Sequence, residues 1–216
     1  MTLIVSLLRR GWGLPGAICR FICLRLPYFR FVRDTRDAQN PNTLGDWYRQ
    51  EIKGVNRGPY WPVHPASMVT GWKNILIGVD TSPGLMPGCY IQGIGKIRIG
   101  DYTQIGPNAS IISANHDPEN LRNHICKEVD IGRHCWLGAG SVVLPGVTLG
   151  HFTMVGAGSI VTKSFPKGYQ VLAGNPARII ADLDPENCAE IRNTHEYHGY
   201  IPASEFERFR NEVLKV

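Results

Sequence analysis

The sequence predicts an all-β solenoid, in which the chain winds around a three-sided prism as a parallel β-helix. Three observations predict this fold class. An aliphatic residue recurs at every sixth position, a small residue follows four places later, and 24 Gly with 15 Pro indicate many turns and few long helices. A period of six fits neither an α-helix nor an alternating strand, but it fits a chain that turns a corner every six residues.

The repeat is clearest in the second half of the chain, where six consecutive hexads follow one another. They begin with Ile131, Leu137, Val143, Leu149, Val155 and Val161, and their fifth positions hold Cys135, Ser141, Val147, Thr153 and Ser159 until Phe165 ends the pattern. Two earlier hexads begin at Ile99 and Ile105, with small Thr103 and Ala109 in the fifth position. We expect three hexads to close one coil, with the aliphatic residue inside the prism and each coil stacked on the next.

The two blocks of hexads are out of phase with each other. Ile99 and Ile131 are thirty-two residues apart, which is not a multiple of six, so a segment must be inserted between Ile111 and Ile131. Residues 113–124 are polar, and we therefore predict a loop over 112–130 that is extruded from a corner of the prism. Loops on a rigid scaffold are where binding and catalytic residues tend to gather.

The flanking segments complete the predicted domain organisation. Residues 66–180 form the β-helix domain, with irregular coils over 72–97. Residues 1–65 form a basic, apolar N-terminal extension that is partly helical. Residues 181–216 form a C-terminal tail, expected to be mostly helical over 185–216 because its end is amphipathic. The apolar positions of that end are Phe206, Phe209, Val213 and Leu214.

The formal net charge of +5 is concentrated at one end of the chain. Residues 1–33 contain six Arg and no Lys, Asp or Glu, so the rest carries a net charge of −1. This argues against a protein-wide nucleic-acid surface. No apolar run reaches the ~20 residues that a spanning helix needs. Two interpretations of residues 2–33 stay open: peripheral contact with an anionic membrane, or a helical subdomain packed on the prism or on a partner subunit.

The six cysteines have no secretory context and no spacing typical of a metal site. We expect them to be reduced thiols of a cytoplasmic protein, and we expect no bound metal.

Four features together resemble the hexapeptide-repeat acetyltransferases. They are the hexads, the loop segment Asn115-His116-Asp117-Pro118, the run Trp136-Leu137-Gly138-Ala139-Gly140, and residues 155–163 leading to Gly174-Asn175-Pro176-Ala177-Arg178. The resemblance covers about residues 66–180, and it is to the galactoside and maltose, the xenobiotic and the surface-polysaccharide O-acetyltransferases. It implies a left-handed β-helix and a homotrimer with active sites in clefts between neighbouring prisms. Acetyl-CoA would be the co-substrate, and no metal would be needed.

The resemblance also implies roles for individual residues. His116 corresponds to the catalytic base, and Trp136 to the aromatic residue beside the acetyl group. Ala139 and Ala157 correspond to backbone N–H donors for the pantetheine arm or thioester oxygen. The residues that correspond to those near the nucleotide phosphates are Thr162, Lys163 and Arg178. Asn115 and Asp117 are candidate acceptor contacts. We expect a backbone carbonyl to orient the His116 imidazole, since residues adjacent in sequence, such as Asp117, seldom hydrogen-bond in that way.

The implied function is direct transfer of an acetyl group from acetyl-CoA to a hydroxyl of a sugar or surface-glycan precursor, in the cytoplasm or at the membrane surface facing it. An imidazole titrating near pH 6.5 can remove the proton of an alcohol as that alcohol attacks a thioester. The acceptor stays open because the family's acceptor-contacting Asn and Asp are not matched over residues 86–94.

Three other functions are weighed against this one. An N-acetyltransferase on an amino-sugar nucleotide would share the fold, donor and base. A zinc enzyme of the γ-carbonic anhydrase type is disfavoured, because the spacing of His116, His124, His134 and His151 does not suit three zinc ligands. A non-catalytic β-helix with a binding or structural role would have no reason to extrude a His-bearing loop between intact hexads.

Overall fold

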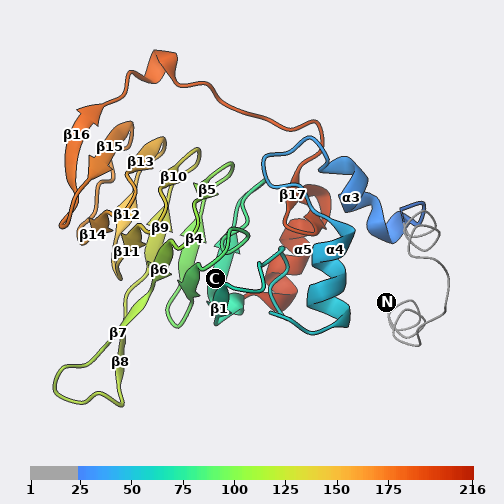
Figure 1. Ribbon diagram of the computed structural model, residues 1–216, viewed down its shortest axis with the longest axis horizontal. Helices are drawn as coiled ribbons and strands as arrows, with labels where there is room; N and C mark the ends of the chain where they lie inside the picture. The colour runs from blue at the N-terminus through green and yellow to red at the C-terminus, as the bar shows by residue number, and fades with distance from the viewer. Residues whose placement is uncertain (1–23) are drawn as a thin grey trace.

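The computed structural model describes residues 24–216, and three parallel β-sheets wound around one prism dominate it (Figure 1). Membrane contact was one of two open interpretations of residues 2–33. Residues 2–23 of that segment lie outside the described residues, so the structure bears only on residues 24–33. Among the described helices, none is both long enough and apolar enough to cross a membrane.

The three sheets form the faces of the prism. Sheet A contains β1 (Met68–Thr70), β3 (Tyr90–Gln92), β6 (Ser110–Ile112), β11 (Val142–Val143) and β14 (Ile160–Val161). Sheet B contains β2 (Ile75–Ile77), β4 (Ile97–Ile99), β9 (Val129–Ile131) and β12 (Thr148–Leu149). Sheet C contains β5 (Gln104–Ile105), β10 (Trp136–Leu137), β13 (Thr153–Val155), β15 (Gln170–Ala173) and the antiparallel closing strand β16 (Arg178–Asp182). From β9 to β14 the chain visits sheets B, C and A in turn, so each corner moves it to the next face.

The strand register confirms that three hexads make one coil. Leu137 pairs with Val155, and Val143 with Val161, eighteen residues later in both cases. Across the phase break, Ile99 pairs with Ile131, thirty-two residues later. The additional fourteen residues leave the prism between β6 and β9, and the coils on either side stack as though they were absent.

The interior contains the two residue types that the hexads predict. The aliphatic residues that open the six hexads, and the small residues in the fifth position, are all at most 3% exposed. The aliphatic residues, together with Cys135 and Val147, belong to one continuous hydrophobic core along the prism. Since burying an aliphatic side chain contributes roughly 1.5–3 kcal/mol, these repeated contacts are the main stabilising element of the domain.

The inserted residues form a hairpin that projects from the corner between sheets A and B (Figure 1). Its antiparallel strands are β7 (Ala114–His116) and β8 (His124–Cys126). The predicted extrusion is therefore confirmed, although the insertion is a paired hairpin and not an irregular loop. Pairing fixes which of its side chains face one another.

A row of stacked rings lines the corner between sheets B and C. Tyr102, His134, Phe152 and Tyr169 stack in succession, with ring centroids 5.2, 4.7 and 5.0 Å apart. Each occupies the left-handed backbone region, with φ between 51° and 57°. Stacked aromatic pairs contribute about 0.5–1.5 kcal/mol each, which offsets part of the cost of that conformation.

The C-terminal tail corrects one expectation. It was predicted to be mostly helical over 185–216, but its one described α-helix is α5 (Ala203–Val213), preceded by the 3₁₀ turn η4 (Pro185–Asn187) and the pair β17 (Tyr197–His198) and β18 (Ile201–Pro202). The intervening chain runs extended back along the prism (Figure 1). Contacts with the corner hold it there, because Arg133 pairs with Glu190 and the Asn193 N–H donates to the Tyr102 hydroxyl.

The described part of the N-terminal extension packs on the chain itself. It contains η1 (Pro27–Phe29), α3 (Arg30–Asp34), α4 (Leu44–Trp47) and the π-helical turn η2 (Tyr48–Ile52), and η3 (Trp72–Asn74) follows β1. Phe29, Phe31, Trp47 and Tyr197 form a second small core, and Arg30 pairs with Glu205 at 2.5 Å. For residues 24–33 the packed interpretation is therefore the one the structure supports.

Replacing Leu137 by Ala tests how far the stability of the domain depends on side chains buried inside the prism. Leu137 is fully buried, so Leu137→Ala should lower the free energy of unfolding by about 2–5 kcal/mol, through lost transfer energy and the cavity left behind. Thr148→Ala, which changes an outward-facing residue of β12, should shift it by less than about 0.5 kcal/mol. Equal urea midpoints for the two variants would contradict this account.

His198 makes the stability dependent on pH. Its ring stacks on Phe206 at 3.7 Å, and Nδ1 lies 2.8 Å from the Ile77 carbonyl oxygen. Burial lowers the pKa of His198 below its ordinary value of 6.5, because it disfavours the charged imidazolium. The unfolded chain therefore takes up a proton first as the pH falls below about 6.5, and stability is lost toward acid pH. Urea titrations between pH 7.5 and 5 should show this loss, with a shallower slope in His198→Phe.

Candidate functional site

His116 lies at the end of β7 with an exposed imidazole. Its Nδ1 is 2.8 Å from the backbone carbonyl oxygen of Leu121. Because a carbonyl oxygen can only accept, Nδ1 carries the proton in this arrangement, and Nε2 is left with a free lone pair. The expectation that a backbone carbonyl orients this ring is confirmed, and the tautomer it selects is the one a proton acceptor requires.

The turn of the hairpin places that carbonyl. The Asp117 N–H donates to the Asn123 carbonyl, the Asn123 N–H donates to the Asn120 carbonyl, and the Asp117 carboxylate accepts the N–H of Glu119 at 2.9 Å. Asp117 thus organises the turn and does not orient the imidazole. Asn115 is exposed beside His116 and pairs across the hairpin with Ile125.

Charged residues fasten the base of the hairpin to sheet B. Arg98 donates to Glu128 at 2.8 Å and contacts Asp130 at 3.3 Å. The hydrogen bond from Arg98 lowers the pKa of the Glu128 carboxyl, and the guanidinium pKa is raised in return. These exposed contacts contribute little to stability. They link strands β4 and β9 of sheet B next to the base of the hairpin.

Trp136 lies on sheet C, away from the hairpin. Its side chain is 46% exposed on the outer face, in register with Gln104 on one side and Met154 on the other. An indole this exposed is not needed to fill the prism, whose interior is occupied by the next residue, Leu137. It is available to contact a ligand or another subunit.

Ala139 and Ala157 lie at the corner between sheets C and A, one coil apart. Both are exposed. A Cβ added at Gly138 would come within 2.6 Å of the Ala157 backbone nitrogen, so only glycine permits the coils to stack this closely here. The result is a smooth corner at which an extended molecule can approach the backbone.

Thr162, Lys163 and Arg178 are exposed near the C-terminal end of the prism. Lys163 lies over the ring of Phe165, and an Arg178 guanidinium nitrogen donates to the Ala177 carbonyl. Within residues 24–216, neither cation forms an ion pair with a carboxylate. Nearby Lys167, by contrast, pairs with Asp182 at 3.0 Å. Cations without a carboxylate partner are suited to bind phosphate.

One chain does not bring all these residues together. His116, Thr162 and Lys163 follow strands of sheet A at its corner with sheet B, whereas Ala139 and Ala157 precede strands of sheet A at its corner with sheet C. The two groups therefore occupy opposite edges of one face of the prism. A site that uses both must form between two copies of the chain.

The described residues contain no candidate metal site, and two of the described cysteines, Cys89 and Cys135, are buried. No group of three or more His, Cys, Asp or Glu among residues 24–216 is arranged to hold a metal ion. The four described cysteines are free. Burial raises the pKa of the Cys135 thiol to about 11 and also raises that of Cys89, so both are protonated and unreactive at neutral pH.

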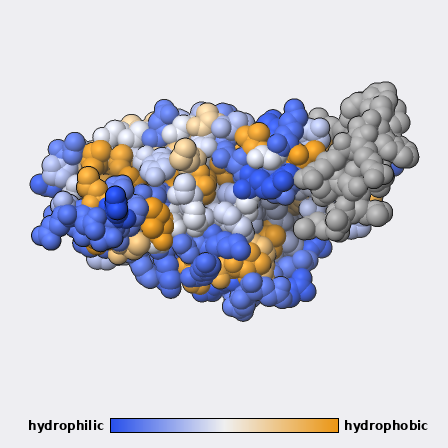
Figure 2. Space-filling model, turned by 90° about the horizontal axis from the view of Figure 1, so that it is seen from below, coloured by the Kyte–Doolittle hydropathy of each residue, from blue (hydrophilic) through white to orange (hydrophobic). Residues whose placement is uncertain are grey.

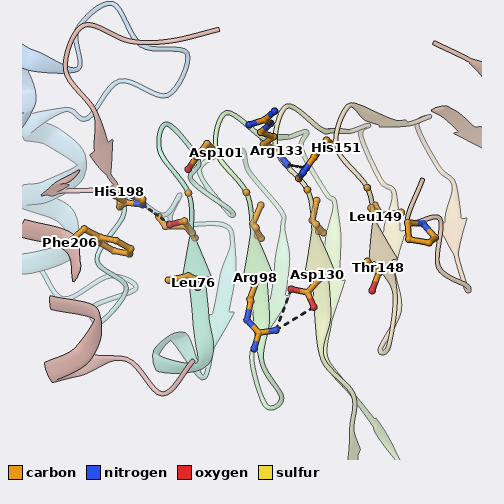
Figure 3. A pocket seen from close by; sticks show the side chains of 18 of the residues that line it. Leu76, Arg98, Asp101, Asp130, Arg133, Thr148, Leu149, His151, His198 and Phe206 are labelled. Carbon is orange, nitrogen blue, oxygen red and sulfur yellow. Dashed lines mark hydrogen bonds and ion pairs between the residues drawn. The ribbon is translucent and has the colours of Figure 1, made fainter. Parts of the chain in front are cut away.

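A groove of about 680 Å³ lies over the outer face of sheet B, beside α5 (Figure 3). Leu76, Arg98 and Asp130 project into it from the strands, and His198 and Phe206 close one end. None of the residues predicted for the active site lines this groove. Its cations Arg98, Arg133, Lys167 and Arg210 already pair with carboxylates, so we place the chemistry at the hairpin and not here.

The surface around the hairpin is mixed in character. Figure 2 views the molecule from below Figure 1, the side toward which the hairpin projects. The prism end, at the left of that view, is largely hydrophilic with separate hydrophobic patches. The exposed hydrophobic residues of the hairpin are Leu121 and Ile125, at 70% and 44%.

Comparison with known proteins supports one family. The model of the bacterial transferase hexapeptide family, with six repeats, matches residues 128–163. Nodulation protein L of Rhizobium meliloti is 39% identical over 147 residues, which is 64% of this chain and 79% of that protein. The chain spans about half the length of three further relatives, which are 33–48% identical.

Solved structures agree in fold. A maltose O-acetyltransferase from Clostridium difficile is 29% identical, with a TM-score of 0.52 over 76% of this chain and 86% of that one. A galactoside acetyltransferase in complex with coenzyme A has a TM-score of 0.56 at 24% identity, covering 81% of this chain and 88% of that one. The second likeness speaks for the fold alone. Together with the repeat, these similarities imply the left-handed form of the β-helix.

Proposed function

This chain belongs to the bacterial hexapeptide-repeat transferases, and from that premise we propose that it transfers an acetyl group from acetyl-CoA to a hydroxyl of a sugar or surface-glycan precursor. The observation that carries the proposal is the hydrogen bond between His116 Nδ1 and the Leu121 carbonyl, which leaves Nε2 free to accept a proton. The similarity to a maltose O-acetyltransferase supports a sugar hydroxyl as the acceptor.

In the proposed reaction His116 acts as general base. As the acceptor oxygen attacks the thioester carbonyl carbon, its proton moves to Nε2. The tetrahedral intermediate then expels the CoA thiolate, the carbon–sulfur bond breaks, and the imidazolium returns the proton to sulfur. Atoms and charge balance without a covalent enzyme intermediate. A backbone N–H at Ala139 or Ala157 would stabilise the oxyanion, commonly by about 3 kcal/mol per donor.

Acetyl-CoA fits residues from both edges of sheet A, with its thioester end at the corner between sheets C and A. The exposed Trp136 indole would cover the acetyl end, and the closely stacked Ala139 and Ala157 would let the pantetheine arm approach the backbone. Thr162, Lys163 and Arg178 would bind the phosphates, as supported by the absence of carboxylate partners for both cations in the described chain.

We further propose that the enzyme is a homotrimer with its sites between subunits. The support is the separation of the two groups of residues along opposite edges of sheet A, since a cleft between prisms would bring the hairpin of one copy to the alanine corner of the next. Polysaccharide biosynthesis is the setting that a glycan acceptor suggests. The alternative is transfer to the amine of an amino-sugar nucleotide. An assay with a panel of hydroxyl and amino acceptors distinguishes the two reactions.

Replacing His116 by Ala tests the base directly. His116→Ala should lower kcat for acetyl-CoA-dependent acetylation by about 10²- to 10⁴-fold, because proton removal from the acceptor is lost. Free-thiol release would be followed against hydroxyl and amino sugars, nucleotide sugars and lipid-linked glycans. Glu119→Gln, in the same turn, is the control and should keep activity. Unchanged turnover in His116→Ala would remove the assignment, provided that sedimentation shows the same oligomer.

The donor site is tested by removing the two cations. Lys163→Ala and Arg178→Ala should each raise KM for acetyl-CoA about tenfold or more and leave kcat within about twofold, since a hydrogen bond to a charged group contributes about 1.5–3 kcal/mol and about 1.4 kcal/mol corresponds to tenfold. The effect should vanish with acetyl-pantetheine, which has no nucleotide. Lys167→Ala provides a matched control because Lys167 is already paired with Asp182. Equal changes in KM for acetyl-CoA and acetyl-pantetheine would mean that Lys163 and Arg178 do not bind the phosphates.

A further inference from the structure

We infer that His124 is a positioning residue for the His116 imidazole. This inference rests on the proposed function, in which His116 is the base. The resemblance that identified His116 assigns no role to His124, and by sequence alone His124 is one more polar residue of the inserted loop. The hairpin register brings the two rings together.

The two histidines form a cross-strand pair. His116 on β7 pairs with His124 on β8, and their ring centroids are 4.5 Å apart at an interplanar angle of 41°. Directly paired residues on antiparallel strands project to the same side of the hairpin. The two imidazoles therefore lie beside each other on that side, with their planes tilted.

The remaining residues on that side cannot replace this contact. Side chains alternate along a strand, so Ala114 and Cys126, which pair with each other, share the side with the two histidines. Ala114 carries a single methyl group, and Cys126 lies two pairs farther from the turn than His124. His124 supplies the ring contact of His116 on this side of the hairpin.

Two contacts together determine how His116 is held. An exposed imidazole would otherwise sample several rotamers, and a general base must be held close to its productive geometry. The Leu121 carbonyl constrains the edge of the ring at Nδ1, and His124 constrains its face. Neither contact uses Nε2, so the nitrogen that takes the proton stays accessible.

The geometry favours positioning over proton relay. The only hydrogen bond found for the His116 ring within the described chain is the one to Leu121, and none joins the two imidazoles. A relay would need a nitrogen-to-nitrogen contact, whereas positioning needs only a flat apolar surface. A phenylalanine at 124 should therefore serve almost as well as histidine.

Two substitutions at this position test the inference. His124→Ala should lower kcat about three- to fivefold with KM for acetyl-CoA unchanged, the upper part of the range expected from losing an aromatic cross-strand pair. His124→Phe should retain kcat within about twofold, because the ring contact is preserved. Cys126→Ala, on the same strand and the same side, is the matched control and should behave as the wild type. Imidazole ¹⁵N NMR should show the Nδ1–H tautomer of His116 in the wild type and His124→Phe, and a tautomer mixture in His124→Ala.

The outcomes separate this inference from the proposed function. Full kcat in His124→Ala would overturn the positioning role while leaving His116 as the base. Equal losses in His124→Phe and His124→Ala would also overturn it, because they would mean that His124 acts through a ring nitrogen. If His116→Ala stays active, the assignment of His116 as the base fails, and absence of acetyl transfer in the wild type would contradict the proposed function itself. The NMR comparison would then still report whether His124 orders the neighbouring ring.

Discussion

The burial of one aliphatic side chain per hexad is the constraint on which the rest of the structure depends. Residues such as Leu137 and Val155, one coil apart, stack inside the prism and bring their strands into parallel register. Each coil covers the apolar interior of the next, so the scaffold is regular and rigid. Outward-facing positions, and corner positions where the coils leave room for a side chain, can then differ without disturbing the core.

The site uses this freedom at corners. At the corner between sheets A and B, fourteen added residues leave the prism as a hairpin, and Ile99 still pairs with Ile131 as if they were neighbours in the repeat. At the corner between sheets C and A, glycine at 138 permits close stacking and exposes the backbone near Ala157. At the corner between sheets B and C, stacked rings instead hold the C-terminal tail. Similar corners of one repeat thus carry three different tasks.

The hairpin illustrates how an exposed loop residue can be held in a definite orientation. Hydrogen bonds within the turn place the Leu121 carbonyl, that carbonyl selects the His116 tautomer, and His124 lies against the ring. All of these groups come from within about a dozen residues of one insertion. The prism supplies only a fixed base, where Arg98 contacts Glu128 and Asp130.

The sequence by itself determined the repeat, the inward-facing residues and the position of the insertion, because a six-residue period is a local pattern that can be counted along the chain. The resemblance of its motifs to a family also singled out His116 as the candidate base, and the expected contact of its ring with a backbone carbonyl is present. Only the tertiary structure decided that the insertion is a hairpin, that Leu121 supplies the carbonyl and that His124 lies beside His116. It also showed that the tail is largely extended, because Glu190 and Asn193 find partners on a distant corner. Pairing across a hairpin and docking on a corner depend on residues far apart in sequence, and no local period records them.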